Sequence, residues 1–178
     1  DLATKQRYAR EKERIARYAA SLAGDDDVVY LDTGTTVLHM ASHLKDSKAL
    51  FVTSSIDFAG MLSAFECRVY VLGGALKPGT VDIVGAEALN AIRRYNFTKV
   101  FLGTSGVSLS QGFTTPDPEA AALKALAAAQ AQSVYMLADS SKFGRVTAAA
   151  ILPLDGAQII TDRLPDRKYL DSTDVIAV

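Results

Sequence analysis

The chain has 178 residues, with 19 Lys and Arg against 20 Asp and Glu and a formal net charge of -1. It carries no basic surplus for neutralising nucleic-acid phosphates, so we do not expect it to bind DNA strongly on its own. An apolar content of 49% with 22% charged residues is typical of one globular domain. We expect no membrane segment and no signal peptide, because the apolar runs are short and the first residues are charged. Cys67 is the single cysteine, and we expect a cytoplasmic protein without disulfides.

Short apolar runs alternate with amphipathic, alanine-rich stretches along the chain. A first helix is predicted where Ile15, Ala19 and Leu22 share one face, and Gly24 ends it. The apolar runs are predicted strands, and helices are predicted between them. The predicted strands are residues 28–32, 49–53, 68–74, 98–103, 133–139, 158–162 and 174–178, and the predicted helices are residues 36–44, 55–64, 84–95 and 118–131.

Most of the predicted strands are continuous apolar runs, which is typical of parallel strands buried on both faces. We therefore predict a single α/β domain over residues 1–178, built on a mostly parallel sheet with helices on both faces. Residues 112–120 contain a glycine and two prolines between two well-patterned elements. This segment is expected to be a mobile or shielding loop.

The segment LDTGTTV at the end of the first strand is typical of an anion site. Gly34 allows the backbone to approach a ligand closely, and Thr35 and Thr36 add hydroxyl donors at a predicted helix start. Asp32 ends the strand just before this turn. The alternative is a plain helix cap, because Asp and Thr are common capping residues.

Other strand ends carry small or hydroxyl-bearing residues of the same kind. In an open α/β sheet these carboxyl ends form the ligand crevice, so the turns indicate a bound polar metabolite. The alternative is compact turn chemistry, in which Gly and Ser are common. The residues concerned are Thr53, Ser54, Gly73, Gly74, Gly103, Thr104, Ser105 and Gly106.

Three charged residues and two histidines are weaker candidates. Lys142 lies just after Asp139 beyond a predicted strand and could reach a phosphate, or the two could form a surface turn. Glu119 begins a helix and could bind sugar hydroxyls, although acidic residues favour helix starts in any case. His39 and His43 have metal-ligand spacing on a predicted helix, but a third ligand is missing, so no metal is predicted.

Taken in order, these motifs resemble a known family. The segments EKERIARYAASL, LDTGTT, VTSS, VLGGALKPGTVDIVG, KVFLGTSGV, PDPEAA, LADSSKFG and IITD are similar to the C-terminal, effector-binding half of DeoR-type bacterial repressors of sugar metabolism. Each motif is weak alone, whereas the ordered set is specific and spans most of the chain. The family's sensor fold is similar to that of ribose phosphate isomerase, glucosamine phosphate deaminase and CoA transferases.

The resemblance implies a phosphorylated sugar or polyol as effector, no cofactor, a homo-oligomer, and contact with operator DNA only through a winged helix-turn-helix domain that this chain lacks. Residues 1–10 would then be a connecting segment. It implies a phosphate loop at Asp32, Gly34, Thr35 and Thr36, closed by Thr53, Ser54, Gly73, Gly74 and Gly103 to Gly106, with Glu119, Asp139 and Lys142 joining from the far side.

Two features bear on this assignment. Members usually carry a lysine four residues after the glutamate of the EA motif, whereas here Leu123 stands at that position and Lys124 follows it. The alternative function is a sugar-phosphate isomerase of the same fold, which needs a carboxylate base. Thr104 and Ser105 stand where related isomerases place acids, so we predict no catalytic residues, with Glu119 as the remaining candidate base.

Overall fold

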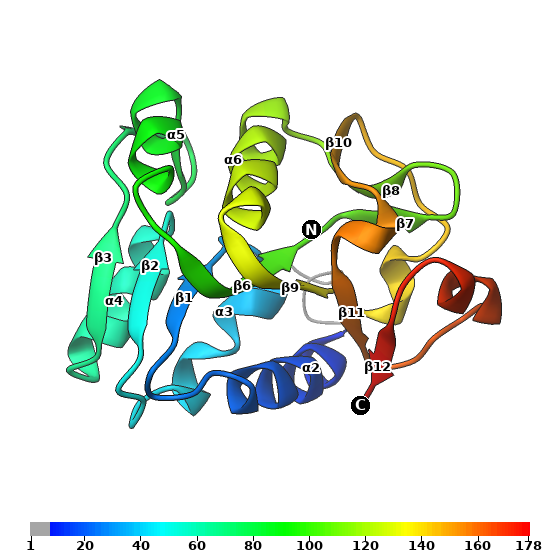
Figure 1. Cartoon of the computed structure of the whole chain (residues 1–178), viewed down its shortest axis with the longest axis horizontal. Helices are drawn as coiled ribbons and strands as arrows, with labels where there is room; N and C mark the ends of the chain where they lie inside the picture. Colours follow the sequence, from blue (N-terminus) through cyan, green and yellow to red (C-terminus); the bar gives the residue numbers. More distant parts are fainter. Residues whose placement is uncertain (1–7) are drawn as a thin grey trace.

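The predicted strands form one parallel sheet. The computed structural model describes residues 8–178, so most of the predicted connecting segment 1–10 lies outside the described residues. The sheet has seven strands in the order β12-β11-β9-β6-β1-β2-β3, and every neighbouring pair is parallel (Figure 1). The strands are β1 (Val28–Leu31), β2 (Leu50–Thr53), β3 (Arg68–Val71), β6 (Phe97–Gly103), β9 (Ala131–Leu137), β11 (Gln158–Thr161) and β12 (Val175–Ala177).

Helices cover both faces of this sheet, which confirms the predicted α/β fold (Figure 1). On one face lie α2 (Ala9–Ser21), α3 (Thr35–Leu38) and α4 (Ile56–Ala64), and on the other lie α5 (Ala86–Ile92) and α6 (Pro118–Ala129). Val29 and Leu31 of β1 pack with the first group of helices, and Tyr30 between them packs with the second. Because both faces are buried, the strand is apolar at every position.

Local capping sets where two of these helices begin. Ser55 precedes α4, and its hydroxyl accepts a hydrogen bond from the backbone N–H of Phe58 at 3.1 Å. Asp117 caps α6 in the same way, with Pro118 in the first helical turn, where a missing N–H costs nothing. Within residues 8–178, no helix is long and apolar enough to cross a membrane.

The helix predicted over residues 36–44 is wrong in length. α3 has four residues and is followed by a separate 3-10 turn, η1 (Ala41–His43). The backbone N–H of Met40 bonds to Val37 at 2.9 Å, and that of His43 bonds to Met40 at 3.0 Å, so the spacing is three residues. The β-branched run Thr35 to Val37 favours helix weakly. The tighter turn lets Met40 and Leu44 both enter the core.

The strand predicted over residues 68–74 ends at Val71, and only part of it is covered. Arg68, Tyr70 and Val71 are exposed, so β3 is an open edge of the sheet instead of a strand buried on both faces. The chain then forms a hairpin of β4 (Ala75–Leu76) and β5 (Ile83–Val84). The helix predicted over residues 84–95 is too long at both ends, because Val84 belongs to β5 and α5 ends at Ile92.

The loop predicted over residues 112–120 is wrong for its first half. Residues 112–115 form β8 (Gly112–Thr115), which is buried along its whole length. It lies between β7 (Gly106–Ser108) and β10 (Ala149–Leu152) in a small antiparallel sheet. The remaining short segments are 3-10 turns at η2 (Ser140–Lys142), η3 (Leu154–Gly156) and η4 (Arg167–Asp171).

Candidate ligand-binding site

A polar cavity of about 310 Å³ lies at the carboxyl ends of β1 and β6. It is formed by the turns after these strands, the β4–β5 hairpin, the start of α6 and η2. Larger and more open hollows beside β10 and β12 are lined by no lysine or arginine. The residues that line the polar cavity are Thr33, Gly34, Thr35, Thr36, Lys77, Asp82, Gly103, Thr104, Ser105, Thr115, Asp117, Ala120, Lys124, Leu137 and Lys142.

Lys124 lies at the floor of the cavity, where it forms a buried ion pair with Asp32. Lys124 is 6% exposed and Asp32 is 3% exposed, and the Lys124 ammonium also donates to the Gly103 carbonyl at 3.1 Å. The Gly103 N–H donates to Asp32 Oδ2 at 2.9 Å. An ammonium has three protons, so Lys124 keeps one for a ligand after these two contacts. Asp32 therefore acts through Lys124 and Gly103 and is not one of the lining residues.

The turns after β1 and β6 approach each other at Gly34 and Gly103. A Cβ on Gly34 would lie 3.4 Å from the Gly103 Cα, and a Cβ on Gly103 would lie 3.4 Å from the Gly34 Cα. One added Cβ would therefore lie at ordinary van der Waals distance from the opposite turn, whereas side chains at both positions would compete for the same space. Both glycines line the cavity.

The β4–β5 hairpin contributes Lys77 and Asp82 to the cavity lining. Lys77 pairs with Asp117, the cap of α6. The hydrogen bond from Lys77 lowers the pKa of Asp117, and the same contact raises the pKa of Lys77. The pair therefore links the hairpin to the start of α6, and both of its residues line the cavity.

Asp82, from the same hairpin, is a partly buried carboxylate whose charged form is disfavoured by its surroundings. Burial and the nearby charge of Asp32 raise the pKa of Asp82 above its ordinary value of 3.8, although Lys124 and Lys77 oppose the shift. The folded chain therefore takes up a proton on Asp82 more readily than the unfolded chain. An ionised Asp82 at neutral pH lowers the free energy of unfolding.

Asp82→Asn is accordingly expected to raise the melting temperature at neutral pH. The gain should shrink as the pH falls towards 3.8, where Asp82 takes up a proton in the parent as well. Thermal melts across this pH range measure the effect, with Asp26→Asn at an exposed position as the matched control. A gain that does not change with pH would contradict the assignment of this cost to the Asp82 charge.

The structure brings together part of the residue set predicted from the sequence. Seven predicted residues line the cavity: Gly34, Thr35, Thr36, Gly103, Thr104, Ser105 and Lys142. Within this group the Thr104 hydroxyl already lies within hydrogen-bond distance of the Gly106 and Thr114 carbonyls, at 2.8 and 2.9 Å. The four-residue α3 has too short a dipole for the predicted helix start to be a strong anion site.

Other predicted residues lie outside the cavity lining. The Thr53 hydroxyl donates to the Leu31 carbonyl at 2.7 Å, and the Tyr30 hydroxyl donates to Ser54 at 3.1 Å, so these two residues tie β1 to β2. Gly73 lies in a different hollow, against α5. A Cβ on Gly74 would lie 2.8 Å from the Val84 carbonyl, and one on Gly106 would lie 2.4 Å from the Arg145 carbonyl. These two glycines serve packing.

The two remaining acidic candidates, Glu119 and Asp139, also lie outside the cavity lining. Glu119 is exposed and does not line the cavity, whereas Asp117, two residues earlier, does. Asp139 is fully buried behind η2, where one carboxylate oxygen accepts from the Ser141 N–H at 3.0 Å. Its other oxygen has no hydrogen-bond partner in the part of the chain that the structure describes.

Sequence reasoning missed several lining residues, above all Lys124. Leu123, at the position where the family's lysine was expected, lies in the apolar core. Lys124 follows Ala121 by three residues and precedes Ala127 by three, so it lies on the buried face of α6. That spacing was readable in the sequence, because a lysine on the apolar face of a helix requires a partner. No comparable sequence pattern marks Lys77, Asp82 and Asp117, because contacts between distant segments bring these residues to the cavity.

The two histidines have a different role from metal binding. Nδ1 of His39 lies 3.3 Å and Nε2 of His43 lies 2.5 Å from the Glu13 carboxylate of α2. Burial raises the pKa of Glu13, but the hydrogen bonds to the two histidines outweigh this and lower it. Among residues 8–178 no group of three His, Cys, Asp or Glu side chains is placed to hold a metal.

A parallel sheet with a polar cavity at the carboxyl ends of its strands is the arrangement typical of α/β domains that bind ligands. The model of the DeoR C-terminal sensor domain matches residues 7–163. The chain therefore belongs to the family of DeoR C-terminal sensor domains, as the motifs predicted.

Relatives and solved structures agree with this membership. The chain is 42% identical over 94% of its length to the HTH-type transcriptional regulator FruR of Bacillus subtilis, and 35% identical over 93% to the HTH-type transcriptional repressor GlcR of the same organism. It spans 68% of the first and 65% of the second, so it corresponds to about two thirds of each. A ribose 5-phosphate isomerase from Plasmodium falciparum has the same fold, with a TM-score of 0.55, 16% identity, and coverage of 76% of this chain and 52% of that one.

Proposed function

We propose that the chain is the sensor of a cytoplasmic transcriptional repressor. In this proposal the cavity binds a phosphorylated sugar or polyol, and binding changes the DNA affinity of a winged helix-turn-helix domain in the longer protein. A ligand can do this only by binding one conformation more tightly than another. The family membership supports the regulatory role, and the chemistry of the cavity supports the class of effector.

The observation that carries the proposal is the environment of Lys142. Among the residues that the structure describes, Lys124 pairs with Asp32 and Lys77 pairs with Asp117, whereas Lys142 has no carboxylate partner. It lines the same cavity as the hydroxyls of Thr35 and Ser105. An unpaired ammonium beside hydroxyl donors is suited to a phosphate group.

The rest of the cavity suits a small polyhydroxylated body. Asp82 and Asp117 offer carboxylate oxygens, which accept hydrogen bonds from hydroxyl groups. A volume of about 310 Å³ is at the lower end of the range for ligand pockets, which fits a sugar phosphate better than a dinucleotide. These carboxylates also disfavour a second phosphate, so we expect monophosphates to bind better than bisphosphates.

A thermal-shift panel of phosphorylated sugars and polyols tests the proposal, with each unphosphorylated parent compound and inorganic phosphate as controls. At a hundredfold excess over Kd, the effector should add about 2.7 kcal/mol to the free energy of unfolding and raise Tm by about 5–10 °C. Lys142→Met should weaken binding by about 1.5–3 kcal/mol, the typical cost of losing a hydrogen bond to a charged group. Lys45→Met, at an exposed lysine, should leave affinity unchanged.

Two results would contradict the proposal. One is a panel in which no phosphorylated compound raises Tm. The other is a bound compound whose affinity is the same in Lys142→Met and in the parent, because the phosphate would then lie elsewhere.

The alternative, an isomerase of the same fold, is favoured by a single observation. Asp82 is a carboxylate with a raised pKa beside Lys124 in the cavity, which is where a general base would lie. Thr104 and Ser105 stand where the related isomerases place acids. Each compound that raises Tm should therefore be incubated with the protein and checked for conversion, and we expect none.

We also propose that the protein is a homo-oligomer. Exposed apolar side chains lie on the edge strand β3, where Tyr70 is 54% exposed and Val71 is 42% exposed. An uncovered edge strand with apolar neighbours is a common interface with another copy. Sedimentation equilibrium measures the oligomeric state directly.

A further inference from the structure

Helix α2 is attached to the turn that carries the cavity through a buried lysine. Lys12 is 5% exposed, and its ammonium donates to the Thr35 hydroxyl oxygen at 3.0 Å. Thr35 lines the polar cavity on one side and an apolar hollow beside α2 on the other. This one side chain thus connects a candidate ligand contact to the most N-terminal helix that the structure describes.

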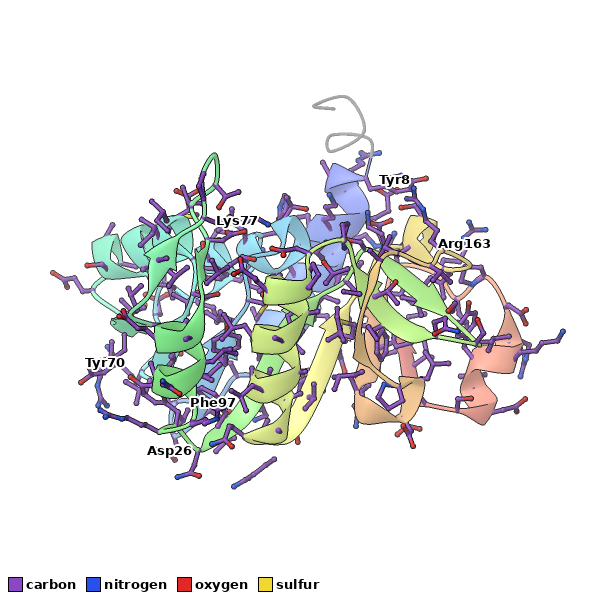
Figure 2. All side chains as sticks on the ribbon, turned by 90° about the horizontal axis from the view of Figure 1, so that it is seen from above. Tyr8, Asp26, Tyr70, Lys77, Phe97 and Arg163 are labelled. Atoms are coloured by element: carbon purple, nitrogen blue, oxygen red, sulfur yellow. The ribbon has the colours of Figure 1, made fainter. Side chains whose placement is uncertain are left out.

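The neighbouring residue of α2 makes a second attachment to the same segment. The Glu13 carboxylate contacts His39, which caps the end of α3, and His43, the last residue of η1. Polar contacts from Lys12 and Glu13 therefore hold α2 to both α3 and η1. Figure 2 shows Tyr8, just before α2, and Lys77 of the hairpin at one edge of the molecule, while Asp26 and Phe97 lie at the opposite edge. The first turn of α2 is thus at the cavity end of the sheet.

The direction of the hydrogen bond decides what Thr35 can offer to a ligand. An ammonium only donates, so the Thr35 oxygen is the acceptor and its own proton is available to another group. A hydroxyl that accepts from a cation becomes a stronger donor, since hydrogen bonds in a chain polarise one another. The arrangement Lys12 to Thr35 to anion is therefore cooperative, and each bond strengthens the other.

We infer that Lys12 couples occupation of the cavity to the stability of α2. An anion that accepts from the Thr35 hydroxyl strengthens the Lys12 contact and suppresses opening of the first turns of Ala9–Ser21. By thermodynamic reciprocity, the Lys12 contact raises the affinity for the anion by the same factor. The inference rests on the proposed function, because it needs an anion in the cavity. In the longer protein, this coupling would reach the segment before α2.

Hydrogen exchange of the whole chain, followed by mass spectrometry, tests the coupling. Inorganic phosphate is the probe, with chloride at equal ionic strength as the reference, and calorimetry on the same samples measures phosphate binding. In the parent, phosphate should slow exchange of peptides from Ala9–Ser21. In Lys12→Met, which keeps the apolar stem, that slowing should disappear and phosphate affinity should fall about 2- to 12-fold. Arg10→Met removes a charge from an exposed position of the same helix and should behave like the parent.

Thr35 variants approach the same bond from the cavity. Thr35→Ser keeps the hydroxyl and should preserve the slowing, whereas Thr35→Val keeps the shape and should abolish it. Phosphate that binds the parent without slowing exchange in α2 would overturn the coupling and leave the proposed function standing. So would slowing that persists in Lys12→Met. If calorimetry and the thermal-shift panel detect no phosphorylated ligand at all, the proposed function fails and the coupling fails with it.

Discussion

Lys124→Met is expected to destabilise the fold by about 3–5 kcal/mol, because it leaves the Asp32 carboxylate buried without its counter-charge. The loss exceeds that of an ordinary surface ion pair, since both groups are almost fully buried. The Gly103 carbonyl also loses its hydrogen bond from Lys124. Chemical denaturation at neutral pH measures the free energy of unfolding.

A second variant separates the charge effect from lost packing. Asp32→Asn combined with Lys124→Met removes the unpaired charge, so the double variant should be more stable than Lys124→Met alone. The same double variant should fail to bind the effector, because the ammonium on the cavity floor is absent. Equal stability of the single and double variants would show that the buried charge is not what makes Lys124 important.

Gly112→Ala is expected to cost about 2–4 kcal/mol, for two separate reasons. Gly112 has φ +67°, a left-handed conformation that disfavours residues with a Cβ. In addition, a Cβ there would lie 2.4 Å from the Leu152 carbonyl and 2.9 Å from the Pro153 Cα. Backbone atoms cannot rotate away as a side chain can, so β8 and β10 must separate.

Gly79→Ala is the matched control for this prediction. Gly79 has φ +74°, but a Cβ built there meets no atom within 4 Å. It should therefore show only the conformational cost, about 1–2 kcal/mol. The difference between the two variants measures the steric part. If Gly112→Ala were no worse than Gly79→Ala, residues 112–115 would behave as the open loop that the sequence predicted and not as a buried strand.

Lys124 and Gly112 lie where the sequence prediction and the folded structure differ most. Residues 112–120 were predicted to be a loop because Gly and the two prolines interrupt regular elements. The structure uses Gly112 to enter a strand and Pro118 to begin a helix, both of which suit these residues. Gly112 and Pro118 mark the ends of elements, but the loop prediction is wrong for residues 112–115, because a strand of four residues is too short to show a period.

Some of the predicted site residues line the cavity and others do not. Gly34, Thr35, Gly103 and Ser105 line the cavity as their positions at strand ends predicted. The carboxyl ends of adjacent parallel strands must meet at one edge of a sheet, so residues after β1 and β6 could be assigned without coordinates. The turn after β2 carries similar residues, but Thr53 and Ser54 point their hydroxyls at β1 and so serve the sheet.

Local patterning in the sequence was sufficient for the seven parallel strands, the α/β class and the family, because continuous apolar runs and ordered motifs are properties of short segments. Contacts between distant segments required the folded structure. Lys124 reaches Asp32 across 92 positions of the chain, Lys77 reaches Asp117 across 40, and Lys12 reaches Thr35 across 23. Such pairs depend on how helices pack on the sheet, and the packing energy is shared among many apolar residues that specify no single polar partner. The packing of the fold therefore brought Lys77 and Asp117 to the cavity, whereas Lys142 lines it as the local segment LADSSKFG predicted.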